Sequence, residues 1–123
     1  MYWTESYLRP EYIESAYFLY TATKDPFYLN VGKELVTSLE LYARVACGYA
    51  ALKDTRSGLH DDRMDSFFLA ETLKYLYLLF SEPTDLLIDL HDYVFTTEAH
   101  LLPLNLARKN FTALTGHNFP VTK

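Results

Sequence analysis

The sequence predicts an all-α protein built as an array of αα-hairpins. Three stretches of the chain carry apolar residues at the three-to-four-residue spacing of amphipathic helices. Short polar segments containing proline or glycine separate these stretches. One helix-turn-helix pattern also occurs twice. Together these observations favour paired helices over a sheet.

The first helix is predicted over residues 10–22 and the second over residues 27–42. Pro10 suits a first helical position, and the acidic side chains that follow it favour the positive end of a helix. Lys24-Asp25-Pro26 breaks the first helix, and apolar residues at helical spacing mark the second. Gly48 ends this region.

A third helix is predicted to end near Phe80. Residues 48–62 form a polar stretch that predicts a loop or a short hairpin, after which Asp61 or Asp62 can cap the helix. The helix is apolar on nearly every side. Such a helix is expected to be buried within the core of a larger protein.

The remaining segments carry weaker signals. A short helix is predicted over residues 85–90, and β-prone residues predict a short extended segment near 93–97. Residues 106–123 have no clean period and are predicted to be an irregular tail.

The internal repeat appears when the chain is shifted by the distance from Glu14 to Glu71. Corresponding positions then carry similar residues: Ser15 and Thr72, Phe18 and Tyr75, Leu19 and Leu76, Asp25-Pro26 and Glu82-Pro83. Each unit places one carboxylate near a helix start. Because hairpin arrays generally need about three or more units, two units predict a piece of a larger array.

Composition excludes several classes of function. The net charge is −5 and the basic residues are dispersed, which argues against nucleic-acid binding. The apolar stretch over residues 67–80 contains charges and is too short to cross a bilayer, so no transmembrane segment is expected. Residues 1–5 show no secretory signal.

Acidic residues stand among apolar residues in three motifs, over residues 8–15, 62–72 and 94–100. An ionised carboxylate removed from water costs several kcal/mol or more unless it is paired or hydrogen-bonded. Carboxylates that recur on apolar helices therefore indicate a polar ligand or a reaction. If the helix starts converge, their carboxylates and aromatic rings would suit a sugar.

These motifs resemble glycoside hydrolase family 47, the α-1,2-mannosidases, and most closely its endoplasmic-reticulum degradation-enhancing branch. The resemblance runs from about Tyr7 to about Pro103 and includes Phe95-Thr96-Thr97-Glu98-Ala99-His100. It implies that residues 1–105 are the C-terminal part of an (α/α)7 barrel catalytic domain. The N-terminal hairpins of that barrel would be a partner of this chain.

The resemblance also implies roles for individual residues. Glu11 matches the carboxylate assigned as catalytic base, and Arg9 would orient it or hold the sugar. Three further matched residues are expected to contact the substrate: Glu14, Phe67 and Glu71.

Two residues of the third motif are implied to lie near a metal. Thr97 matches the threonine that binds Ca²⁺ through its hydroxyl and carbonyl oxygens, which are ligands that calcium prefers. Glu98 matches the adjacent acid near the substrate and the metal-bound water.

The function implied is inverting hydrolysis of terminal α-1,2-linked mannose from high-mannose N-glycans on misfolded glycoproteins, in the endoplasmic-reticulum lumen. Inversion needs an acid and a base. The resemblance places the acid in earlier hairpins, so this chain alone is expected to be inactive.

Two other interpretations stay open at this point. One is a non-catalytic module that binds glycans or misfolded proteins. The other is a helical-repeat interaction domain, in which Glu11 satisfies a helix dipole, Phe67 belongs to the core and residues 96–98 form a turn or helix cap.

Overall fold

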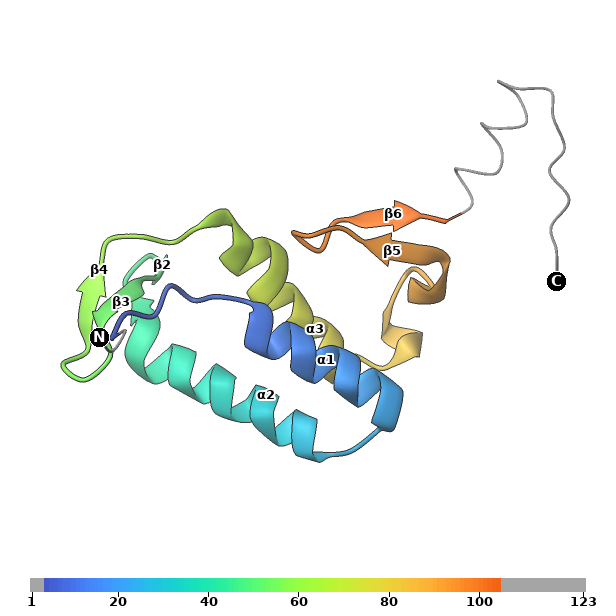
Figure 1. Cartoon of the computed structure of the whole chain (residues 1–123), viewed down its shortest axis with the longest axis horizontal. Coiled ribbons are helices and arrows are strands. Elements are labelled where there is room, and N and C mark those ends of the chain that lie inside the picture. Colours follow the sequence, from blue (N-terminus) through green and yellow to red (C-terminus); the bar gives the residue numbers. More distant parts are fainter. Residues whose placement is uncertain (1–3, 105–123) are drawn as a thin grey trace, which may run out of the picture.

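The computed structural model describes residues 4–104. α1 (Glu11–Thr23) and α2 (Phe27–Ser38) form a helical hairpin, and α3 (Lys74–Phe80) packs against both (Figure 1). The first predicted helix is confirmed to within one residue at each end. It is capped by Lys24, whose backbone is left-handed and whose N–H donates to the Tyr20 carbonyl.

The second predicted helix is also confirmed, because α2 continues through a π-helical turn, η1 (Leu39–Ala43). Two short hairpins follow. β1 (Arg44–Val45) pairs with β2 (Gly48–Tyr49), and β3 (Ala51–Asp54) pairs with β4 (Leu59–Asp61). The second hairpin is the one that the polar stretch predicted.

The third helix begins later than predicted. It covers residues 66–80 and starts with the π-helical segment η2 (Phe68–Leu73). Asp61 cannot cap it because Asp61 is paired in β4, and the Ala51 N–H donates to the Arg63 carbonyl at 2.8 Å. These ladder bonds hold the chain extended up to the first helical turn.

The prediction of a short helix over residues 85–90 is wrong. Two 3₁₀ turns stand there instead, η3 (Pro83–Asp85) and η4 (Leu90–Asp92). The Asp85 carboxylate accepts from the Glu82 N–H, and the Asp89 carboxylate accepts from the His91 N–H. Such local bonds compete with a regular helix.

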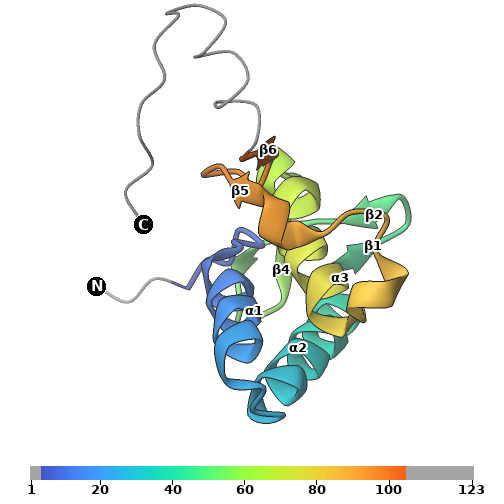
Figure 2. The same ribbon diagram turned by 90° about the vertical axis from the view of Figure 1, so that its right-hand side faces the viewer.

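The extended segment is confirmed as β5 (Tyr93–Phe95), which pairs with β6 (Leu101–Pro103), whereas residues 96–97 belong to the connection between these strands. This hairpin lies on the side of the α1–α3 pair opposite α2 (Figure 1, Figure 2). Within residues 4–104 the core is helical, but three two-stranded antiparallel sheets add to it. The all-α prediction therefore holds for the core and omits the sheets. The predicted irregular tail over residues 106–123 lies outside the described residues.

The core joins the three helices to the β5–β6 hairpin. Its largest fully buried side chains are Tyr75, Phe68, Ile13 and Thr72. α2 and α3 approach closely at Gly32, where an added Cβ would lie 2.5 Å from Leu79 Cδ2. A side chain at this position would therefore force the buried Leu79 side chain to shift.

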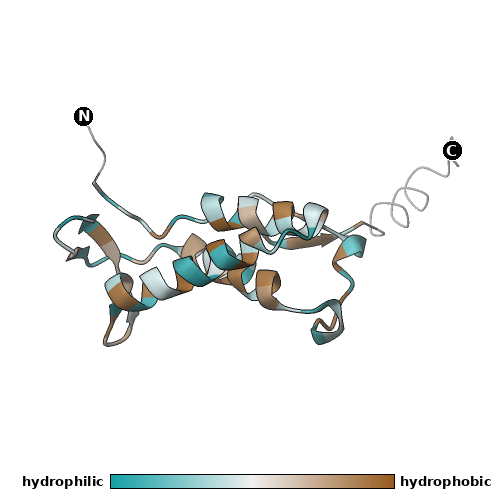
Figure 3. Cartoon of the chain, turned by 90° about the horizontal axis from the view of Figure 1, so that it is seen from below, coloured by the Kyte–Doolittle hydropathy of each residue, from teal (hydrophilic) through white to brown (hydrophobic). Residues whose placement is uncertain are grey.

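The third helix is buried on one side only in this chain. Tyr75, Leu76 and Leu79 face the core, whereas Leu69 and Tyr77 are 58% and 60% exposed. Apolar positions mix with hydrophilic ones along the helices (Figure 3). Within residues 4–104 no helix has both the length and the apolar character needed to span a membrane.

Candidate functional site

Four predicted site residues meet where α1 and η2 begin. The Glu71 side chain is only 6% exposed, and its burial raises the pKa of its carboxyl. The negative charges of Glu14, Glu98 and Glu11 raise that pKa further, in that order, while Lys74 lowers it. The structure thus brings together four carboxylates that are far apart in sequence, with Glu71 the most buried.

Arg9 links Glu11 to Phe67 at the edge of this cluster. Its Nη1 lies 3.6 Å from Glu11 Oε1, and its guanidinium lies 5.6 Å from the Phe67 ring centroid. Arg9 and Glu11 are both largely exposed, so the ion pair contributes little to stability. The same exposure leaves both groups available to a ligand.

The backbone that carries Glu71 is irregular. Glu71 lies within the π-helical segment η2, a type of turn that often occurs at functional sites. One residue further, the buried Thr72 hydroxyl donates to the Leu8 carbonyl at 2.8 Å. Leu8 has a left-handed φ of 60°, which is strained for a branched residue. This bond fixes the strained segment that leads to Arg9 against the helix that carries Glu71.

The connection between β5 and β6 presents Thr97 and Glu98 at the surface. The Thr96 hydroxyl accepts from the His100 N–H at 3.1 Å, which closes the turn. Lys74 Nζ donates to the Ala99 carbonyl at 2.7 Å, and this hydrogen bond attaches the turn to α3. Thr97 and Glu98 are therefore exposed on a braced turn.

The donor chemistry at this turn suits calcium, which prefers hard oxygen ligands. The hydroxyl and carbonyl of Thr97 supply such oxygens, and Glu98 adds a carboxylate next to them. Within residues 4–104 no group of three or more His, Cys, Asp or Glu side chains is arranged to hold a metal.

Two neighbours of the cluster carry no signal in the motifs. Lys74 is the cation that acts on Glu71, and Tyr75 donates its hydroxyl to Glu14 Oε1 at 3.3 Å. Both follow Glu71 on a helix whose sequence reads as apolar core. The charge of Lys74 and the hydroxyl of Tyr75 were the available clues.

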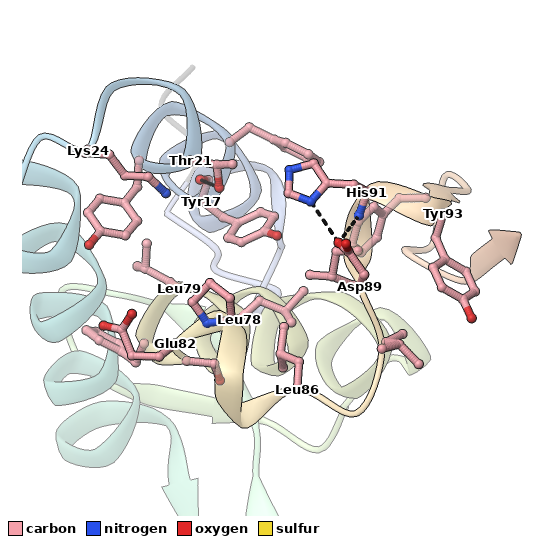
Figure 4. A pocket seen from close by; sticks show the side chains of 18 of the residues that line it. Tyr17, Thr21, Lys24, Leu78, Leu79, Glu82, Leu86, Asp89, His91 and Tyr93 are labelled. Carbon is pink, nitrogen blue, oxygen red and sulfur yellow. Dashed lines mark hydrogen bonds and ion pairs between the residues drawn. The ribbon is translucent and has the colours of Figure 1, made fainter. Parts of the chain in front are cut away.

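A separate pocket of about 960 Å³ lies at the other end of α1. It is bounded by the C-terminal halves of α1 and α3 and by residues 81–95, with Tyr17, Lys24 and Leu78 among its lining residues (Figure 4). Asp89 and His91 contact each other at its edge, with 2.8 Å between Oδ1 and Nδ1. None of the predicted site residues lines it.

Comparisons with known proteins agree with the motifs. The model of the family described as "Glycosyl hydrolase family 47" matches residues 2–104. Human ER degradation-enhancing alpha-mannosidase-like protein 3 is 62% identical over 133 residues, which cover 99% of this chain and 14% of that protein. Human mannosyl-oligosaccharide 1,2-alpha-mannosidase IC is 52% identical over 106 residues, covering 83% of this chain and 16% of that protein.

A solved structure is similar as well. The alpha-1,2-mannosidase from Trichoderma reesei superimposes with a TM-score of 0.73 and 34% identity. The match covers 82% of this chain and 22% of that enzyme. This chain therefore spans less than a quarter of the enzyme it superimposes on, and an even smaller share of the two human relatives.

Proposed function

Since the chain belongs to glycosyl hydrolase family 47, we propose that it supplies the C-terminal part of an active site that removes terminal α-1,2-linked mannose from high-mannose N-glycans. The observation that carries this proposal is the convergence of Glu71 with Glu14, Glu98 and Glu11 beside Arg9 and Phe67. A buried carboxylate surrounded by other carboxylates destabilises a fold. Hydroxyl groups of a sugar would offset that cost by donating to the acids.

The reaction proposed is hydrolysis with inversion. Glu11 is the base that takes a proton from the attacking water. Because Glu11 is exposed, water can reach its carboxylate. Arg9, paired with Glu11, orients the carboxylate. Glu14 and Glu71 accept hydrogen bonds from mannose hydroxyls, and Phe67 packs against the apolar face of the ring.

Thr97 would hold Ca²⁺ through its two oxygens, with Glu98 beside it. When bound, the ion supplies a positive charge that orients sugar hydroxyls and water near the carboxylates. Lys74 keeps the turn in place through its bond to the Ala99 carbonyl.

The general acid is proposed to come from earlier hairpins that complete an (α/α)7 barrel with this chain. The exposed apolar side chains of the third helix, such as Leu69 and Tyr77, suit contacts with those hairpins. The names of several relatives carry the words "ER degradation-enhancing", which supports a place in the endoplasmic-reticulum lumen and misfolded glycoproteins as carriers of the substrate.

The first test is calorimetry on the chain itself. Ca²⁺ is titrated first and an α-1,2-linked mannose disaccharide second, with Thr97→Ala as the variant and Thr37→Ala, on the exposed side of α2, as its control. We expect binding that Thr97→Ala abolishes and Thr37→Ala preserves. A folded chain that binds neither Ca²⁺ nor the disaccharide would contradict the proposal and support the helical-repeat interaction domain instead.

The second test measures catalysis in a chimera. Residues 4–104 replace the matching segment of the Trichoderma reesei enzyme, and mannose release is measured with Glu11→Gln and with Glu34→Gln, an exposed acid on α2. Loss of the base should reduce kcat by at least about 100-fold, whereas Glu34→Gln should leave it unchanged. An unchanged kcat in a folded chimera that carries Glu11→Gln would contradict the assignment of the base.

A further inference from the structure

We propose that Tyr75 is a positioning residue, whose hydroxyl holds the Glu14 carboxylate in the orientation in which Glu14 accepts a sugar hydroxyl. The part of this proposal that concerns sugar rests on the proposed function. The contact between the two side chains does not.

The contact joins two helices across the core. The Tyr75 side chain on α3 is fully buried, and its hydroxyl donates to Glu14 Oε1 on α1 at 3.3 Å. A buried tyrosine hydroxyl needs a partner, and Glu14 is the one it has. Burial raises the pKa of Tyr75 and the charge of Glu14 raises it further, so the hydroxyl stays a donor at neutral pH.

Aromatic packing fixes where this hydroxyl points. The Tyr75 ring lies 5.7 Å from the ring of Tyr17, 5.9 Å from that of Phe18 and 5.9 Å from that of Phe95, measured between centroids. These neighbours come from α1 and β5, so two elements pack against the ring that α3 carries. The hydroxyl is a fixed anchor for Oε1 and leaves Oε2 of Glu14 to an incoming ligand.

Electrostatic repulsion explains why Glu14 needs an anchor. Glu14 is the acid that acts most strongly on Glu71, so the two carboxylates repel each other. Glu14 is only half-buried and could relieve this repulsion by turning its side chain towards water. The neutral hydroxyl of Tyr75 opposes that rotation without adding a charge of its own.

The test compares Tyr75→Phe with Tyr17→Phe in the full chain. Both changes remove one hydroxyl from the same aromatic cluster and keep the ring, but only Tyr75 bonds to Glu14. Affinity for the α-1,2-linked mannose disaccharide is measured by calorimetry, and the rotamer of Glu14 by ¹³C NMR couplings. We expect Tyr75→Phe to weaken binding about tenfold and to spread Glu14 over several rotamers, and Tyr17→Phe to change binding less than about twofold.

Each outcome decides the point. A single unchanged Glu14 rotamer in Tyr75→Phe, or equal loss of affinity in both variants, would overturn the proposal. If the unmodified chain binds no disaccharide, the proposed function fails, and the rotamer measurement alone decides the role of Tyr75. If Tyr75→Phe does not fold, Glu14→Gln replaces it. That change should shift the ¹³C resonances of the Tyr75 ring, and unaltered resonances would overturn the contact.

Discussion

Replacing Thr72 by valine should destabilise the fold by about 2 kcal/mol. The side chain is 1% exposed, and its hydroxyl donates to the Leu8 carbonyl at 2.8 Å. Valine has nearly the same shape, so packing is preserved and only the hydrogen bond is lost. Leaving a buried carbonyl without its donor costs about 1–3 kcal/mol. The loss should also release the strained backbone at Leu8, whose φ is 60°.

The free energy of unfolding in urea measures this effect, with Thr37→Val as the matched control. The Thr37 hydroxyl also donates to a carbonyl, that of Lys33 at 2.9 Å, but Thr37 is exposed and the bond lies within one helix. The control should change stability by no more than about 0.5 kcal/mol. A Thr72→Val chain as stable as the control would refute the view that this bond anchors the segment before Arg9.

Three further predictions concern single residues of α2 and of the third helix. Glu71→Gln should raise the free energy of unfolding at pH 7. The raised pKa of Glu71 makes the folded chain hold a proton that the unfolded chain has released, so stability falls as pH rises from about 4 through the folded-state pKa. Urea titrations across this pH range should show that slope in the wild type and a smaller one in the variant. Gly32→Ala should destabilise by about 1–3 kcal/mol in the same assay, since the new methyl group collides with Leu79 and this outweighs the helix propensity gained. Lys74→Met removes the donor to the Ala99 carbonyl and should cost about 1–2 kcal/mol, with faster amide exchange in the β5–β6 turn as its local signature.

Local sequence signals predicted the elements whose causes are local. Pro10 and the Lys24-Asp25-Pro26 break set the ends of α1, and both appear in the sequence within a turn of the boundary. The start of the third helix was missed because its cause is not local. Pairing of β4 with β3, and of residue 63 with residue 51, keeps the chain extended up to residue 65.

The same distinction holds for the site. The motifs identified Arg9, Glu11 and Glu71, and the structure places all three in one cluster. The sequence could not show that Glu71 is the most buried of the acids, because that depends on how α1 packs over η2. It also gave no reason to single out Tyr75, which looks like any other aromatic residue of an apolar helix.

The repeat explains why acids from distant parts of the chain converge. Glu14 and Glu71 occupy equivalent positions in two units, near the starts of helices that pack side by side. The same local pattern, used twice, therefore brings two carboxylates to one end of the helical layer. Burial is the main cause of the raised pKa of Glu71, and repulsion between these two carboxylates raises that pKa further.

The two units differ in the hydrogen bonds that their equivalent side chains make. The Ser15 hydroxyl bonds within its own helix, whereas the equivalent Thr72 hydroxyl reaches the segment before Arg9. Phe18 has no hydroxyl, whereas the equivalent Tyr75 donates to Glu14. The second unit therefore makes two side-chain hydrogen bonds, to the first helix and to the segment before it, for which the first unit has no equivalent. These two bonds join the helix that carries Glu71 to the segment before Arg9 and to the helix that carries Glu14, so the second unit fixes the position of the first.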